Sequence, residues 1–218
     1  MSEKEREKVA ITIDDREITA SEGEMLLWVA LDNDIYIPNL CAMKEKSRPS
    51  ASCRLCFVEV EGIPDPVTSC TLPVSQGLVV KTRSPEVDRL VKASFELLIS
   101  DHRLGCKKCP GNSSCELQKI SKERGLKLKS RRFKPFEREA DIDESMEEFT
   151  LDRSRCVLCG RCVWIDHHVA EVGAIGFSLR GIKRKVTTFG DYDLADSPCT
   201  GCGECVKVCP VGALSFNE

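Results

Sequence analysis

The chain has 218 residues, with 32 basic and 35 acidic side chains and a formal net charge of −3. This balance excludes a strong basic field for nucleic acid, and no apolar run reaches the ~18 residues of a membrane span. Residues 1–8 are charged and no apolar stretch of a secretory signal follows them. We therefore expect a cytoplasmic protein, whose fourteen cysteines stay reduced and favour metal binding over disulfides.

The fold class expected is α+β, and residues 1–83 predict a small β-grasp domain. Apolar residues alternate over 9–13, and a short turn leads to a returning strand over 17–20. A second alternating strand over 57–61 and a closing strand over 78–81 complete the expected sheet.

Three helices are predicted, over residues 25–32, 85–100 and 116–124. Ser21 and Glu24 have the spacing of a capping box before the first helix. Ser84 is a good N-cap for the second, because Pro85 then takes the first helical position. Gly125 is expected to end the third helix.

Four cysteines are placed on loops of the first domain, in the spacing C-x11-C-x2-C-x13-C: Cys41, Cys53, Cys56 and Cys70. The plant-type [2Fe-2S] pattern is C-x4-C-x2-C…C, so the central pair and the distant fourth ligand are kept while the first loop is longer. This spacing predicts a [2Fe-2S] cluster. The alternative is that Cys41 and Cys70 are buried thiols that only pack as small apolar side chains.

A second ligand group is expected in residues 84–125, directly after the second helix, in the spacing H-x3-C-x2-C-x5-C: His102, Cys106, Cys109 and Cys115. Imidazole can replace thiolate as a ligand of cluster iron. The spacing predicts a [4Fe-4S] cluster held by one histidine and three cysteines. A structural zinc site with the same four ligands is the alternative.

Residues 126–152 are expected to be a charged linker, basic over 127–134 and acidic over 140–148. A solvated surface loop is the simpler interpretation, and a role at an interface is the alternative.

Residues 153–218 predict a ferredoxin-like domain with two [4Fe-4S] clusters. Its C-terminal part has the run C-x2-C-x2-C-x3-C-P, formed by Cys199, Cys202, Cys205 and Cys209. In such a run the fourth cysteine ligates the other cluster of the pair. A matching run consists of Cys156, Cys159 and Cys162. Cross-ligation therefore assigns Cys209 to this earlier run. An insert separates the two runs, with a hairpin expected over 177–189 around Gly181.

Asp166 occupies the position where cross-ligation requires a fourth ligand for the later run. A carboxylate is a harder ligand than a thiolate, so either Asp166 completes a [4Fe-4S] cluster or the site holds a [3Fe-4S] or water-ligated cluster. His167 or His168 is an alternative ligand, and a capping or surface role for Asp166 is the simplest one. With His102 and Asp166 included, the fourteen cysteines fill four groups of four ligands and none is left over.

From about Val9 to Leu214, these motifs in this order resemble the N-terminal part of the large iron-sulfur subunit of respiratory complex I. They are also similar to the N-terminal arm of iron-only hydrogenases and to the small diaphorase subunit of NAD-linked soluble hydrogenases, which the chain matches best in length. Asp166 is the departure, because that family's pattern often has cysteine there.

The resemblance implies one [2Fe-2S] and three [4Fe-4S] clusters in a subunit that relays single electrons. Its partners would be an NAD(P)-linked flavoprotein subunit and a catalytic or bifurcating subunit, such as a hydrogenase or a formate dehydrogenase. The sequence has no dinucleotide-binding or P-loop glycine pattern and no activated nucleophile motif, so no catalytic site of its own is predicted. A free-standing polyferredoxin-like carrier and a structural zinc protein are the alternatives.

Overall fold

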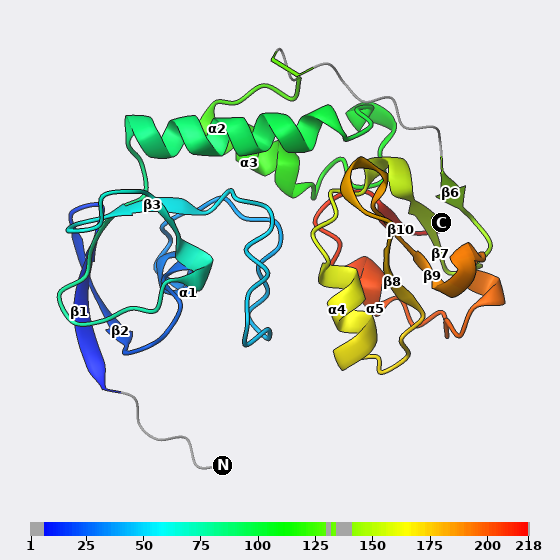
Figure 1. Ribbon diagram of the computed structural model, residues 1–218, viewed down its shortest axis with the longest axis horizontal. Coiled ribbons are helices and arrows are strands. Elements are labelled where there is room, and N and C mark those ends of the chain that lie inside the picture. The colour runs from blue at the N-terminus through cyan, green and yellow to red at the C-terminus, as the bar shows by residue number, and fades with distance from the viewer. Residues whose placement is uncertain (1–6, 130–131, 134–140, 218) are drawn as a thin grey trace. The chain divides into compact units, whose positions relative to one another are not determined.

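The computed structural model describes residues 7–129, 132–133 and 141–217 and divides into two compact units, Met1–Phe95 and Glu96–Glu218 (Figure 1). The division falls inside helix α2 (Pro85–Ser100). Every helix in the described ranges is too short or too polar to cross a bilayer.

The first unit is built on a five-stranded sheet in the order β2-β1-β5-β3-β4. Its strands are β1 (Lys8–Ile13), β2 (Arg16–Ser21), β3 (Phe57–Val60), β4 (Val67–Thr68) and β5 (Val79–Lys81). β1 pairs antiparallel with β2 and parallel with β5. The predicted alternation is confirmed, because Val9, Ile11 and Ile13 are buried in a core that also takes in helix α1 (Leu26–Asp32).

The predicted capping box at the start of α1 is wrong. Ser21 is the last residue of β2, paired with Lys8, and its hydroxyl accepts a hydrogen bond from Lys8 Nζ (3.2 Å). α1 follows Met25 and has no side-chain cap. The backbone N–H of Leu26 instead donates to the carbonyl of Leu72 (2.8 Å), so a distant segment satisfies a donor that a cap would otherwise take.

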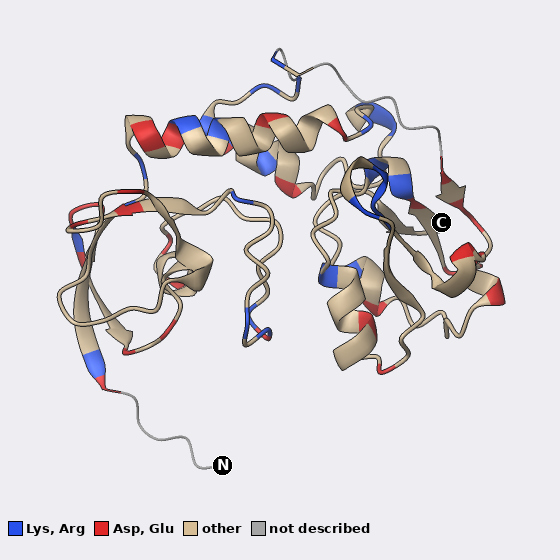
Figure 2. Ribbon diagram, viewed as in Figure 1, with Lys and Arg blue, Asp and Glu red and all other residues tan. Residues whose placement is uncertain are grey.

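The start of helix α2 is as predicted. Ser84 Oγ accepts a hydrogen bond from the N–H of Val87 (3.1 Å), and Pro85 is the first helical residue. Glu86 and Asp88 place negative charge in the first turn, where the helix dipole favours it (Figure 2).

The second unit combines short helices with two small sheets. Its helices are α3 (Glu116–Arg124), α4 (Arg161–His168) and α5 (Glu204–Lys207). Gly125 follows α3 in the left-handed conformation (φ 62°), which confirms the predicted stop. One sheet has the order β10-β7-β6, with β6 (Ile142–Asp143), β7 (Phe149–Asp152) and β10 (Leu214–Phe216). The predicted hairpin is β8 (Ile175–Ser178) and β9 (Lys185–Thr188), which pair antiparallel.

Part of the predicted linker 126–152 belongs to this unit's core instead. β7 pairs with β10 and buries Phe149 and Leu151, so the end of the supposed linker is a central strand. The buried Arg153 Nη1 lies 2.9 Å from an Asp141 carboxylate oxygen, and its Nε donates to the Val186 carbonyl (2.9 Å). One acidic residue of the supposed loop, Asp141, is thus paired with a buried arginine of the fold. Residues 130, 131 and 134–140 of the linker lie outside the described residues.

Candidate metal centres

The cysteines of the first unit form one buried group. Cys41 lies on a loop after α1, Cys53 and Cys56 precede β3, and Cys70 lies in a 3₁₀ turn over Ser69–Thr71. Each is 8 % exposed or less. The backbone N–H of Cys53 donates to Cys41 Sγ (3.5 Å), so the extended first loop returns to its starting cysteine.

These four thiols divide into two hydrogen-bonded pairs. A hydrogen bond from the Cys53 thiol lowers the pKa of Cys41 to about 5, and one from the Cys70 thiol lowers the pKa of Cys56 to about 7. The donors' own pKa values rise correspondingly. Thiolates are the metal-binding form of cysteine. Two pairs of neighbouring sulfur ligands fit a cluster of two irons, each held by two cysteines.

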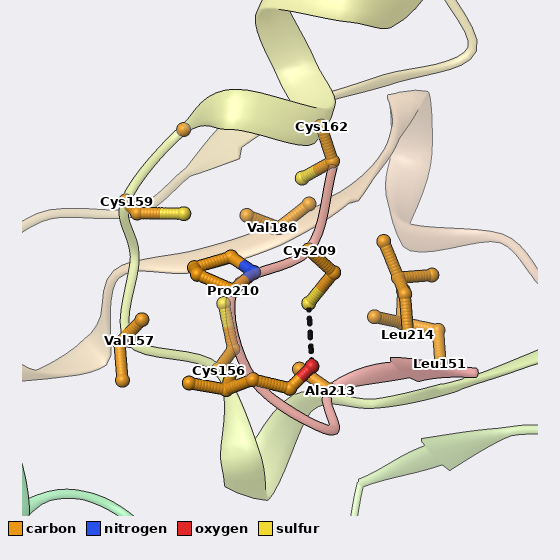
Figure 3. A pocket seen from close by; sticks show the side chains of 12 residues that line it. Leu151, Cys156, Val157, Cys159, Cys162, Val186, Cys209, Pro210, Ala213 and Leu214 are labelled. Carbon is orange, nitrogen blue, oxygen red and sulfur yellow. Dashed lines mark hydrogen bonds between the residues drawn. The ribbon is translucent and has the colours of Figure 1, made fainter. Parts of the chain in front are cut away.

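In the second unit, four cysteines line one pocket: Cys156, Cys159, Cys162 and Cys209. Figure 3 shows their sulfur atoms turned toward a shared space. The structure thus brings Cys209 to the earlier run, as cross-ligation requires. The other lining residues carry no charge: Leu151, Val157, Gly160, Val186, Pro210, Val211, Ala213 and Leu214.

The apolar lining keeps the cysteine thiols of this pocket protonated unless a cation is bound beside them. Burial raises the pKa of the Cys159 thiol to about 12 and that of Cys162 well above its usual value. Such thiols lose their protons only when a nearby positive charge replaces the lost hydration. Cluster iron would supply that charge, and an uncharged wall would suit a compact iron-sulfur cage held by these cysteines.

The loop that holds these ligands depends on Gly160, which has a left-handed backbone (φ 77°) and caps α4. A Cβ there would lie 3.2 Å from the ring of Phe177, so this ring covers the loop directly. Arg184 stacks on the same ring, with its guanidinium carbon 3.9 Å from the centroid. The predicted hairpin carries both residues, but no pattern in the sequence indicated that they cover this loop.

The later run and Asp166 also come near one another. Burial raises the pKa of the Cys199 thiol, and it raises that of Cys205 to about 12. The negative charge of the Asp166 carboxylate raises both pKa values further. Asp166 is buried in α4, and its Oδ2 accepts a hydrogen bond from the N–H of Ile175 (3.1 Å). Cys202, in contrast, is exposed.

The neighbouring histidines have other partners. His167 Nε2 lies 3.0 Å from the carbonyl of Ile175. His168 Nδ1 lies 3.0 Å from the carbonyl of Trp164, and its ring stacks on the Trp164 indole. Asp166 also has a local partner, the N–H of Ile175, but it is the one of the three whose charge acts on both Cys199 and Cys205.

In the segment after α2, His102 has a buried Nδ1 that makes no hydrogen bond within the described part of the chain. Burial lowers the pKa of this imidazole, so it stays neutral and keeps a lone pair for a metal. Cys106 lies in a 3₁₀ turn, Cys109 follows it, and Cys115 precedes α3. A buried nitrogen without a hydrogen bond, followed within thirteen residues of the chain by three cysteines, fits an iron ligand set. In the described ranges no three His, Cys, Asp or Glu side chains are grouped to hold a single ion.

This segment packs on the residues that follow Cys209. The N–H of Glu116, next to Cys115, donates to the carbonyl of Pro210 (2.9 Å). A Cβ at Gly212 would lie 2.4 Å from Cys109 Sγ and 2.9 Å from the backbone nitrogen of Gly111. The histidine-containing group and the Cys209 pocket are therefore joined by direct backbone contact.

A β-grasp sheet with four buried cysteines and a ferredoxin-like unit with a cysteine-lined pocket define an iron-sulfur protein. Residues 6–85 match the 2Fe-2S iron-sulfur cluster binding domain family, and residues 148–215 match the NADH-quinone oxidoreductase subunit 3, ferredoxin-like domain family.

Individual relatives cover nearly the whole chain. The gamma subunit of the NAD-reducing hydrogenase HoxS of Cupriavidus necator is 33 % identical over 94 % of this chain and 86 % of its own length. The NADP-reducing hydrogenase subunit HndD of Solidesulfovibrio fructosivorans is 36 % identical over 96 % of this chain. A crystal structure of an NAD+-reducing [NiFe]-hydrogenase matches with a TM-score of 0.85 and 31 % identity, over 96 % of this chain and 88 % of that one.

The chain belongs to the family of iron-sulfur electron-transfer subunits found in NAD(P)-linked hydrogenases and complex I. It spans 36 % of the length of HndD and 24 % of the NADPH-Fe(3+) oxidoreductase subunit alpha of Geobacter sulfurreducens.

Proposed function

We propose that the chain relays single electrons between an NAD(P)-linked flavoprotein subunit and a catalytic or bifurcating partner, such as a hydrogenase or a formate dehydrogenase. The observation that carries this proposal is the contact between ligand segments, in which one hydrogen bond joins Glu116, next to Cys115, to Pro210, next to Cys209. When bound, an iron-sulfur cluster supplies one-electron transfer with little rearrangement, because charge spreads over several irons and sulfurs. We place the protein in the cytoplasm, where its thiols stay reduced.

The ligand groups proposed are four. The first, Cys41, Cys53, Cys56 and Cys70, would hold a [2Fe-2S] cluster. Three would hold [4Fe-4S] clusters: His102 with Cys106, Cys109 and Cys115; Cys156 with Cys159, Cys162 and Cys209; and Cys199 with Cys202, Cys205 and Asp166. The domain limits proposed remain 1–83, 84–125 and 153–218, with β7 added to the last. A free-standing carrier is not favoured, because the relatives are named as subunits of larger enzymes.

The proposal is tested first by composition. The full chain, purified without oxygen, is expected to hold about fourteen irons and to give EPR signals of both cluster types after reduction. An anaerobic native pull-down should then recover a flavin-containing subunit. Zinc in place of iron, or isolation of the native chain solely as a monomer, would count against the relay.

His102→Cys is expected to lower the potential of its cluster by on the order of 100 mV, because thiolate donates more negative charge to iron than imidazole does. Redox titration followed by EPR measures the shift. His167→Ala is the control for this cluster, since His167 lies in α4 and contacts the Ile175 carbonyl, so the potential of the His102 cluster should stay unchanged. An unaltered potential in a His102→Cys protein with full iron content would show that His102 is not a ligand.

Asp166→Ala is expected to convert the cluster of the later run into a three-iron form that added Fe(II) no longer rebuilds. EPR and iron content before and after Fe(II) addition measure this loss, which is about one iron per chain. Asp166→Asn is the matched variant, because its amide oxygen can still accept from Ile175 while the negative charge is gone. If Asp166→Ala leaves signal, potential and iron content as in wild type, the carboxylate is not a ligand.

A further inference from the structure

The Ser69 hydroxyl is a buried polar group with no assigned role. Ser69 is 0 % exposed, and its Oγ has no hydrogen-bond partner within the described residues. Buried hydroxyls are almost always hydrogen-bonded, so one without a partner points to an acceptor that belongs to the loaded site.

The surroundings of Ser69 are the ligands of the [2Fe-2S] site. Ser69 precedes Cys70 in the same 3₁₀ turn, and its backbone N–H donates to the carbonyl of Cys56 (2.9 Å). The neighbouring hydroxyls of Thr68 and Thr71 are 2.7 Å apart and bond each other. Ser69 is thus the hydroxyl of this turn that remains available to a sulfur atom.

Cys56 is the ligand that Ser69 contacts directly. The hydrogen bond from the Ser69 N–H to the Cys56 carbonyl holds the two residues side by side, and both are buried, so the Ser69 hydroxyl lies next to this ligand. Ser52, the hydroxyl residue before Cys53, lies at the surface, where water can replace it. No water replaces a donor that is fully buried.

We propose that, in the iron-loaded protein, Ser69 Oγ–H donates a hydrogen bond to Cys56 Sγ and thereby raises the reduction potential of the [2Fe-2S] cluster. This inference rests on the proposed function. The reduced cluster carries one more negative charge than the oxidised one, so a hydrogen bond to its sulfur stabilises the reduced form more. Ser69 acts through the ligand and is therefore a positioning residue, with an effect on potential and none on ligand number.

Ser69→Ala in the full chain should make reduction of the [2Fe-2S] cluster about tenfold less favourable, which equals ~59 mV for one electron. An anaerobic redox titration followed by the [2Fe-2S] EPR signal measures it. Ser75→Ala is the control, because Ser75 is exposed in the same unit and should keep the wild-type potential. Ser69→Gly is a second variant without the hydroxyl, and the potential of its [2Fe-2S] cluster should fall by a similar amount.

A wild-type potential in either hydroxyl-free variant, with its [2Fe-2S] signal intact, overturns the inference. Loss of the signal in both variants also overturns it, since a hydroxyl that only tunes potential is not needed for assembly. A wild-type chain without any [2Fe-2S] signal would instead overturn the proposed function and this inference together.

Discussion

Cys209→Ala is expected to abolish the [4Fe-4S] cluster of Cys156, Cys159 and Cys162, and to spare the cluster whose ligands lie nearest to it in sequence. Cys209 lines the same pocket as those three cysteines. Alanine leaves three sulfurs in an apolar enclosure, where burial already raises the pKa of Cys159 to about 12 and keeps the thiol protonated. The expected loss is about four irons per chain, measured by iron analysis and by EPR of the reduced protein.

Cys202→Ala is the matched control for this prediction. Cys202 belongs to the same C-terminal run but is exposed, so its replacement should not disturb the packing of the pocket. It is expected to affect the other cluster of the pair only. If both variants lose the same EPR signal, Cys209 is not cross-ligated and the proposed grouping fails.

Features that depend on neighbours in sequence could be predicted well. Ser84 followed by Pro85 fixed the start of α2, because both act on the first turn of the same helix. Gly125 fixed the end of α3 for the same reason. Cysteine spacing was also informative, because a short loop limits which sulfur atoms can reach one cage.

Features that depend on distant segments could not be predicted. The first-turn donor of Leu26 is satisfied by the Leu72 carbonyl, so the capping signal at Ser21 had no function to perform. β7 exists because β10 pairs with it, and the acidic residues around it suggested a loop. The buried Arg153 lies 3.5 Å from the buried Asp143 carboxylate and bonds the Val186 carbonyl, and no local pattern distinguishes such a buried ion pair from solvated charges.

The walls of the candidate sites were harder to predict than their ligands. Phe177 and Val186 come from a hairpin that the sequence indicated, but nothing in the pattern placed them against Gly160 and the Cys209 pocket. Apolar covering residues carry no chemical signature of their own, whereas cysteines at fixed spacing do.

Gly212→Ala is expected to disrupt the histidine-containing site, because the added methyl group would collide with one of its ligands. A Cβ at Gly212 would be 2.4 Å from Cys109 Sγ and 2.9 Å from the backbone nitrogen of Gly111. A backbone atom cannot turn aside as a side chain can, so the segment has to move. Overpacking of this kind typically costs ~1–3 kcal/mol. We expect the iron content to fall by up to about four per chain, with loss of the EPR signal that His102→Cys shifts.

Gly105→Ala provides the control, because Gly105 lies in the same segment and an added Cβ there meets nothing within 4 Å. Its φ of 175° is extended backbone that alanine adopts freely. The [2Fe-2S] signal of the first unit serves as an internal reference and should stay constant in both variants.

Gly212→Ala should also affect the pocket of Cys156, Cys159, Cys162 and Cys209. An effect there would show that the two ligand groups are structurally coupled, whereas a local clash would affect the histidine-containing group alone. Gly212 is three residues after Cys209, and the carbonyl of Pro210 between them accepts from Glu116. Displacing the segment therefore strains a hydrogen bond that links the two ligand groups. Magnetic interaction between the two reduced clusters should weaken together with the loss of the first signal. A variant that keeps full iron content and unaltered signals would show that the segment does not dock on Gly212, and the contact between ligand segments would no longer support the proposed relay.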